Sequence, residues 1–324
     1  MSMIFLPKPK FLVLFLSFRC NLKCAMCSCW VKGEAVPELS LGGLSTICTD
    51  PLLYKHIEII NITGGEPTLR RDLDQVIKLI TAHFHRLTRI DISTNGVDTR
   101  AVADAIERAL AIVLPTGIEL TANISIDGLK ETHETIRGQA GIFHKIAQTI
   151  EALKELMLLY PNFKVGLNMT VSRLNVHALE QVRNFAQEKG IGLSFTLAAI
   201  SDIGVESCRT KERFEMDDVS KKEAARFFEG LAAKGLLDKR YARFLLCWLK
   251  KNTRIGGCAF KEGKALLVEP DGKTYLCGNF KDFFVADILK ERLGRKWRAS
   301  LRRGAALAEK CLHCNSNCYL HEAR

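Results

Sequence analysis

Short apolar runs alternate with helical periodicity from Phe11 to Leu197. The first run, Phe11–Ser17, is continuously apolar, which is typical of a strand in a parallel sheet covered on both faces. Similar strand patterns recur at His56–Ile62, Arg89–Ser93, Glu119–Ile126, Val165–Thr170 and Gly192–Leu197. Strands that alternate with helices predict right-handed βα crossovers and one parallel sheet.

Apolar residues recur at helical spacing between most of these strands. They fall within Leu73–Ile80, Val102–Val113, Phe143–Tyr160 and Val176–Glu188. Six strand–helix units are too few for a closed eight-stranded barrel, so the pattern predicts an α/β fold with an open, partial (β/α)6 TIM barrel. In such sheets ligands bind beyond the carboxyl ends of the strands.

The pattern changes after Leu197. Helical stretches begin at Asp217 and cover Leu236–Lys251, and a turn at Glu269–Gly272 joins two short apolar runs in a predicted β-hairpin. Four apolar residues at every fourth position predict an amphipathic helix: Leu289, Leu293, Trp297 and Leu301. We therefore expect a barrel core over residues 1–235 and a small α+β, cysteine-rich domain over 236–324.

Composition supports two such units, because 324 residues with 47% hydrophobic content can form a large domain and a small one. The net charge of +11 weakly favours anionic ligands or nucleic acid. No apolar stretch reaches the length of a membrane span. The 12 cysteines gather towards the two ends, which indicates metal sites rather than disulfides. We expect a cytoplasmic protein with reduced thiols and no membrane partner.

Cys20, Cys24 and Cys27 stand at C-x3-C-x2-C spacing directly after the first strand. Three thiolates on so short a loop can hold three corners of a [4Fe-4S] cube and leave the fourth iron without a protein ligand. A ferredoxin fills all four corners, so an open iron indicates a site that binds substrate or cofactor. A zinc knuckle and chance clustering are the alternatives from spacing alone.

Polar or glycine-containing motifs follow successive predicted strands. Gly64-Gly65-Glu66-Pro67 follows the second, Ser93 and Asn95 mark the end of the third, Ser125 and Asp127 the end of the fourth, and Asn168 lies on the fifth. Each motif alone is ordinary turn chemistry. Their order after consecutive strands predicts one site at the carboxyl edge of the sheet.

The cysteine spacing and the Gly-Gly-Glu-Pro motif together resemble the radical SAM superfamily. The resemblance implies that the open iron binds S-adenosylmethionine, whose reductive cleavage gives a 5′-deoxyadenosyl radical that takes hydrogen from a substrate. Met26 stands where the family usually has an aromatic residue near the adenine, and Arg137 resembles an arginine that pairs with the methionyl carboxylate. The implied cofactor contacts are Met26, Gly64, Gly65, Glu66, Pro67, Ser93, Asn95, Ser125, Asp127, Arg137 and Asn168.

The C-terminal cysteines resemble those of SPASM and twitch domains. Those domains bind an auxiliary [4Fe-4S] cluster through one cysteine before a hairpin, one after it and a later C-x2-C pair. The matching residues are Cys258, Cys277, Cys311 and Cys314, with Cys318 as an alternative to Cys314. The resemblance implies two clusters in all, while the same four ligands also suit tetrahedral zinc.

The leading hypothesis is a radical SAM enzyme whose auxiliary cluster assists oxidation or another modification, with peptide maturation as the first substrate class. No room for a leader-binding domain is expected before Phe11, so dehydrogenation of a sugar or cyclitol alcohol stays open, as does nucleoside or tRNA modification. The resemblance also implies an electron donor such as flavodoxin or ferredoxin. The alternative from another class is a non-catalytic zinc protein or an iron–sulfur electron carrier.

Overall fold

The computed structural model describes residues 7–33, 35–199, 214–306 and 311–316. Parallel strands form the centre of the fold and pair in chain order. They are β1 (Phe11–Ser17), β2 (Ile59–Gly64), β3 (Arg89–Thr94), β4 (Glu119–Ser125), β5 (Phe163–Val171) and β6 (Gly192–Leu197). Their order and positions confirm the partial barrel predicted from the sequence.

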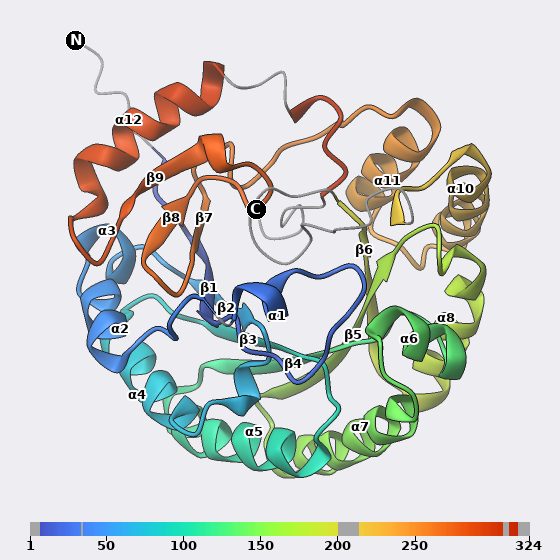
Figure 1. The fold of residues 1–324 in the computed structure, drawn as a ribbon, viewed down its shortest axis with the longest axis horizontal. Helices are drawn as coiled ribbons and strands as arrows, with labels where there is room; N and C mark the ends of the chain where they lie inside the picture. Colours follow the sequence, from blue (N-terminus) through green and yellow to red (C-terminus); the bar gives the residue numbers. More distant parts are fainter. Residues whose placement is uncertain (1–6, 34, 200–213, 307–310, 317–324) are drawn as a thin grey trace.

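Helices surround the outer face of these strands (Figure 1). They are α2 (Leu41–Cys48), α3 (Pro51–Tyr54), α4 (Leu73–His83), α5 (Thr99–Val113), α7 (Ile142–Leu159) and α8 (Leu179–Lys189). Two further helices lie near the carboxyl ends of strands, α1 (Cys29–Lys32) and α6 (Lys130–Arg137). Single 3-10 turns occur at η1 (Pro67–Leu69), η2 (Leu114–Thr116), η3 (Val176–Ala178) and η4 (Lys281–Phe283).

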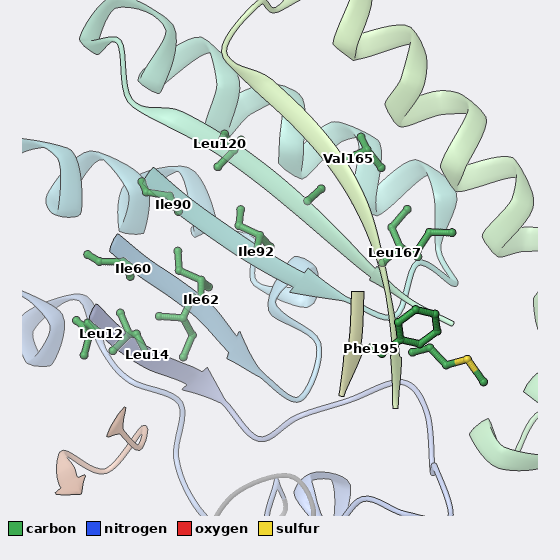
Figure 2. Packing of buried hydrophobic residues seen from close by; sticks show 14 of the residues in the cluster. Leu12, Leu14, Ile60, Ile62, Ile90, Ile92, Leu120, Val165, Leu167 and Phe195 are labelled. Carbon is green, nitrogen blue, oxygen red and sulfur yellow. The ribbon is translucent and has the colours of Figure 1, made fainter. Parts of the chain in front are cut away.

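Alternate strand residues pack against the helices and form the main core, including Ile60, Ile92 and Leu167 (Figure 2). Because successive side chains in a strand point to opposite faces, the residues between them face the barrel interior. On β2–β6 that inner face is largely polar and half-buried, as at Asn61, Ser93, Asn123, Ser125, Asn168 and Thr196. On β1 it is apolar, and Phe11, Val13 and Phe15 pack with Leu267 and Tyr275.

The C-terminal elements continue the barrel's own sheet. They are α10 (Asp218–Ala233), α11 (Lys239–Lys251), β7 (Ala265–Val268), β8 (Lys273–Tyr275), β9 (Phe284–Asp287) and α12 (Leu293–Ala306). Strand β7 pairs in parallel with β1, and β8 and β9 follow in antiparallel order. At the opposite edge, the Tyr241 hydroxyl of α11 donates to the Phe195 carbonyl of β6. The C-terminal elements therefore lie between the two edges of the open barrel (Figure 1).

The predicted hairpin and amphipathic helix are confirmed, with Leu293 and Trp297 buried, but the helix begins at Leu293 and leaves Leu289 in the preceding turn. The division into residues 1–235 and 236–324 stays a prediction. The hairpin of the second segment shares its sheet with β1 of the first. Strand β9 and helix α6 were not predicted. Among the described residues, no helix combines the length and apolar character needed to cross a membrane.

Replacing Trp297 by alanine is expected to destabilise the fold. Trp297 is 1% exposed, and its indole Nε1–H donates to the Pro7 carbonyl at 3.1 Å. Truncating a buried tryptophan costs about 3–5 kcal/mol. Urea unfolding measures the loss, with Arg298→Ala on the exposed side of the same helix as the control. Equal midpoints for the two variants would show that α12 is not docked through Trp297.

Candidate functional site

The loop that follows β1 carries three cysteines at the carboxyl edge of the sheet. Cys24 is buried, and Cys20 and Cys27 are half-buried. The three thiols are close enough together for the charge of each to affect the pKa of the others. Among the described residues, no three Cys, His, Asp or Glu side chains are close enough to hold one metal ion. Thiolates of a cubane cluster bind different irons, so such a cluster does not require them to meet at one point.

The exit of β2 holds this loop through its backbone. The Gly65 N–H donates to the Ser17 carbonyl at 2.8 Å, and the Glu66 N–H donates to the Arg19 carbonyl at 2.8 Å. A Cβ added at Gly65 would lie 1.8 Å from the Arg19 oxygen, and one at Gly64 would lie 2.1 Å from the Ser17 oxygen. The absence of side chains at the two glycines therefore lets the backbone at Ser17 and Arg19 lie directly against the β2 exit. The contact of the two glycines with S-adenosylmethionine stays a prediction.

Glu66 ties the exits of β2 and β3 together. Its carboxylate, 2% exposed, accepts from the Thr68 N–H at 3.1 Å, the Thr68 hydroxyl at 2.7 Å, the Thr94 hydroxyl at 2.9 Å and the Asn95 N–H at 2.7 Å. Burial raises its pKa against the effect of these hydrogen bonds. The next residue, Pro67, is buried and begins η1. Glu66 therefore holds the loops after β2 and β3 together, and the predicted contacts of Glu66 and Pro67 with S-adenosylmethionine stay predictions.

Asn95 joins this scaffold to the cysteine loop. Its side-chain amide donates to Asn21 Oδ1 at 2.7 Å and to Cys20 Sγ at 3.8 Å. Ser93 on the inner face donates to Asn61 Oδ1 at 3.2 Å. These contacts place Asn95 beside the first cysteine and Ser93 against β2, and the contacts of both residues with S-adenosylmethionine stay predictions.

Ser125 and Asn168 lie opposite each other in the register of β4 and β5. Both are half-buried on the inner face. Asn168 Oδ1 accepts from the Ser194 hydroxyl at 3.0 Å and from the Thr196 hydroxyl at 3.2 Å. Met26 is half-buried in the cysteine loop. These positions surround the same edge, and the individual contacts with a cofactor stay predictions.

Helix α6 holds the cysteine loop from the other side. The Ala25 N–H donates to the Ile136 carbonyl at 2.9 Å, and Arg137 Nη1 donates to Cys24 Sγ at 3.9 Å. Arg137 Nε lies 2.6 Å from Asp127 Oδ2, and Asp127 is wholly buried. The other carboxylate oxygen of Asp127 accepts from the Thr170 N–H at 3.0 Å. Asp127 therefore fixes Arg137 against the Cys24 thiol.

Three residues near this loop make contacts that the sequence did not predict. Asn21 accepts from Asn95, and His133 Nδ1 accepts from the Asp127 N–H at 3.0 Å. Cys29 is fully buried, and its N–H donates to Cys27 Sγ at 3.4 Å. Their partners lie on other elements or within a local turn, so apolar periodicity gives no signal for them.

The protonation of the three thiols depends on their surroundings. Burial raises the pKa of Cys20 to about 12 and also raises the pKa of Cys24. The Cys29 side chain donates to Cys27 and lowers the pKa of Cys27 to about 7. Metal binding removes these protons, because the thiolate is the ligand.

Four C-terminal cysteines also gather. Cys277 is buried just after β8. Cys258 and Cys314 are close enough to raise the pKa of Cys277, and they also raise the pKa of Cys311. Cys318 lies outside the described residues. The Asn315 amide donates to the Ala198 carbonyl at 2.6 Å, directly after β6. This contact places the C-x2-C loop beside the end of β6.

Polar donors surround the C-terminal sulfurs. The Asn279 N–H donates to Cys277 Sγ at 3.4 Å, and its amide donates to Cys314 Sγ at 3.7 Å. Arg254 Nη1 donates to Cys314 Sγ at 3.8 Å. The Trp248 indole of α11 donates to the His313 carbonyl at 3.0 Å and holds the C-x2-C loop.

Comparison with known proteins identifies the family. The model of the radical SAM superfamily matches residues 14–186, more than half of the chain. The chain belongs to the radical SAM superfamily. Membership implies S-adenosylmethionine and a [4Fe-4S] cluster, and Cys20, Cys24 and Cys27 lie within the matched segment. Soft thiolates suit an iron–sulfur cluster, and polar donors face the sulfurs, so the residues fit this cofactor.

Curated radical SAM relatives match about half of the chain. It is 30% identical over 174 residues to the Fe-coproporphyrin III synthase of Methanosarcina barkeri, covering 53% of this chain and 40% of the relative. It is 29% identical over 182 residues to the mycofactocin maturase MftC of Mycolicibacterium smegmatis, covering 56% and 42%. The sporulation killing factor maturation protein SkfB of Bacillus subtilis is 26% identical over 163 residues, covering 50% and 36%. The chain therefore spans less than half the length of these relatives.

Solved structures extend the similarity of fold beyond the matched segment. Native anSMEcpe with bound AdoMet and a peptide has a TM-score of 0.64 at 17% identity, covering 91% of this chain and 82% of that one. Streptococcus suis SuiB bound to S-adenosylmethionine has a TM-score of 0.61 at 14% identity, covering 90% and 65%. The similarity therefore includes the C-terminal elements, and at these identities it concerns the fold alone.

Replacing Gly65 by alanine is expected to abolish iron binding at the first cysteine loop. The new Cβ would meet the Arg19 carbonyl at 1.8 Å and push the loop away from β2. Iron and sulfide content after anaerobic reconstitution measures the effect. Gly192→Ala is the control, because a Cβ there meets nothing within 4 Å. Wild-type iron content in Gly65→Ala would contradict the role given to this close approach.

His133 is expected to make stability depend on pH below about 6.5. Burial lowers its pKa to about 3 in the folded protein, so only the unfolded chain takes up this proton as the pH falls below 6.5. Its contribution is complete above that pH and falls by ~1.4 kcal/mol per unit below it. Urea unfolding should therefore show wild type losing about 2 kcal/mol more than His133→Asn between pH 6.5 and 5. His144→Asn on the exposed side of α7 is the control, and equal losses in wild type and His133→Asn would contradict the burial argument.

Proposed function

We propose that this protein is a radical SAM enzyme that modifies a peptide substrate at the carboxyl edge of its barrel. The observation that carries the proposal is the double fixation of the first cysteine loop. The β2 exit binds Ser17 and Arg19 on one side, and α6 binds Ala25 and Cys24 on the other. Such fixation pre-organises three thiolates and limits their freedom before any cofactor arrives.

Each part of the edge has an assigned task. Cys20, Cys24 and Cys27 would hold the [4Fe-4S] cluster, and Ser93, Asn95, Ser125 and Asn168 would line the place for S-adenosylmethionine. When bound, these cofactors supply a 5′-deoxyadenosyl radical. Arg137 would bind the methionyl carboxylate, because its guanidinium offers further donors beside Cys24. Asp127 keeps this arginine in place and supplies the balancing charge.

The C-terminal cysteines would hold an auxiliary [4Fe-4S] cluster. Cys258, Cys277, Cys311 and Cys314 provide the thiolates, and Asn279 and Arg254 donate to two of the sulfurs. An auxiliary cluster on these thiolates would be able to accept an electron from the substrate during oxidation. Zinc on these four ligands is the alternative, and metal analysis separates the two.

The inner wall favours a peptide over a porphyrin. Relatives carry both kinds of name, since SkfB and MftC are maturation proteins and another relative is a coproporphyrin synthase. Porphyrin carboxylates are best bound by free cationic side chains. The cations on the inner face of β2–β6 lie at the amino ends of β3 and β5, away from the predicted site, and both are paired. They are Arg89, paired with Asp91 at 3.2 Å, and Lys164, paired with Glu119 at 2.5 Å. A neutral polar wall beside an apolar one suits the amides and side chains of a peptide.

An alcohol-bearing small molecule would also form hydrogen bonds with this neutral wall, so substrate trials should include both classes. Short peptides and cyclitol or sugar alcohols can be supplied to the reconstituted enzyme and followed by mass spectrometry. We expect a loss of hydrogen or a new bond in a peptide. Turnover of the alcohols alone would replace peptide maturation with dehydrogenation. Comparing flavodoxin, ferredoxin and a chemical reductant would identify the electron donor.

Reconstituted wild type is expected to bind about eight irons and to release 5′-deoxyadenosine when given reductant and S-adenosylmethionine. Cys24→Ala should abolish that release and keep about four irons. Cys277→Ala should lose the auxiliary iron and retain uncoupled cleavage. Cys48→Ala, a buried thiol on α2, is the matched control. Stoichiometric zinc, or cleavage that survives Cys24→Ala, would overturn the proposal.

A further inference from the structure

Arg254 differs from the other groups around the C-terminal cysteines because it brings a positive charge to a ligand. Its Nη1 donates to Cys314 Sγ at 3.8 Å, and its Nη2 donates to the Gly257 carbonyl at 3.0 Å. The guanidinium also lies 5.0 Å from the centre of the Phe244 ring. The Arg254 N–H donates to the Leu312 carbonyl at 2.7 Å, inside the C-x2-C loop. The guanidinium is therefore fixed against one sulfur from several sides.

The first cysteine loop has an arginine too, but its charge is balanced. Arg137 donates to Cys24 Sγ and lies 2.6 Å from the buried Asp127 carboxylate. Arg254 contacts backbone carbonyls, a ring and a sulfur, and no acidic side chain pairs with it within the described residues. Among the described residues, the positive charge beside Cys314 is therefore unbalanced, whereas the positive charge beside Cys24 is balanced by Asp127.

An unbalanced positive charge favours the reduced form of a nearby cluster, because reduction adds a negative charge. Hydrogen bonds to the sulfurs and local charge are the usual determinants of iron–sulfur potentials. We propose that Arg254 is a positioning residue that raises the reduction potential of the auxiliary cluster and so favours its acceptance of an electron. The inference rests on the proposed function, since it requires a cluster on Cys258, Cys277, Cys311 and Cys314.

Asn279 provides a comparison within the same site. It donates to Cys277 and Cys314 but carries no net charge, so it acts on the sulfurs through N–H dipoles alone. Arg254 adds to its hydrogen bond with Cys314 an interaction between its positive charge and the thiolate. Water shields this interaction only in part, since the Arg254 Nε atom is buried. Such interactions are stronger than those at an exposed surface.

The test uses a full-length variant in which Cys20, Cys24 and Cys27 are alanine, so that only the C-terminal cluster remains. In this background Arg254→Gln is expected to lower the equilibrium constant for one-electron reduction at least tenfold, which corresponds to ~59 mV. Arg254→Lys keeps the charge and should restore at least half of that change. Arg243→Gln on the exposed side of α11 is the control. Potentiometric titration followed by electron paramagnetic resonance measures the potential, and iron analysis measures occupancy.

The outcomes separate the two proposals. A background variant without iron would refute the auxiliary cluster itself, and this inference with it. Retained iron with an unchanged potential in Arg254→Gln, or an equal fall in Arg254→Lys, would refute the charge effect alone. Loss of iron in both Arg254 variants would assign Arg254 to loop structure instead. Retained iron, a lowered potential in the glutamine variant and rescue by lysine would support the inference.

Discussion

The close approach of two backbones, after β1 and after β2, is the constraint on which the site depends. A cysteine loop joined only to the end of a strand would sample many conformations, and its thiols would rarely be placed together. Gly64 and Gly65 let the β2 exit bond directly to Ser17 and Arg19, and Glu66 carries that order on to Thr94 and Asn95. Helix α6 adds the second restraint through Ile136 and Arg137. Hydrogen bonds from the sheet and from α6 therefore hold the loop at both sides.

The same sheet connects the two groups of cysteines. Because β7 pairs with β1, the hairpin that leads to Cys277 extends from the strand that leads to Cys20. Asn315 attaches the C-x2-C loop to the other side of the barrel, after β6. The C-terminal elements thus lie across the open side of the barrel. By the strand register Cys277 falls opposite Ala265, level with the start of β1, whereas the first cysteine loop follows the end of β1. Family membership does not by itself include this arrangement, since the family match ends at residue 186.

The strands and most barrel helices could be predicted because their apolar residues repeat at strand or helical spacing. Helix α6 could not, since its buried residues include His133 and Arg137, whose burial depends on Asp127 from a different element. The cysteine positions were informative because metal ligands must be close in sequence or in space. The supporting roles of Glu66, Asn21 and Arg254 depend on partners that are set only by the fold. For Gly64 and Gly65 the resemblance implied contact with S-adenosylmethionine, and only the fold shows the approach of the Ser17 and Arg19 carbonyls.

The central claim is that three thiolates at this edge leave one iron free to bind S-adenosylmethionine. Electron–nuclear double resonance on the reduced cluster, with 15N-labelled S-adenosylmethionine, tests it most directly. A variant with alanine at Cys258, Cys277, Cys311 and Cys314 would remove signals from the second site. We predict a 15N coupling from direct binding of the amino group and altered g-values on addition. An unchanged spectrum with no 15N coupling would contradict the account.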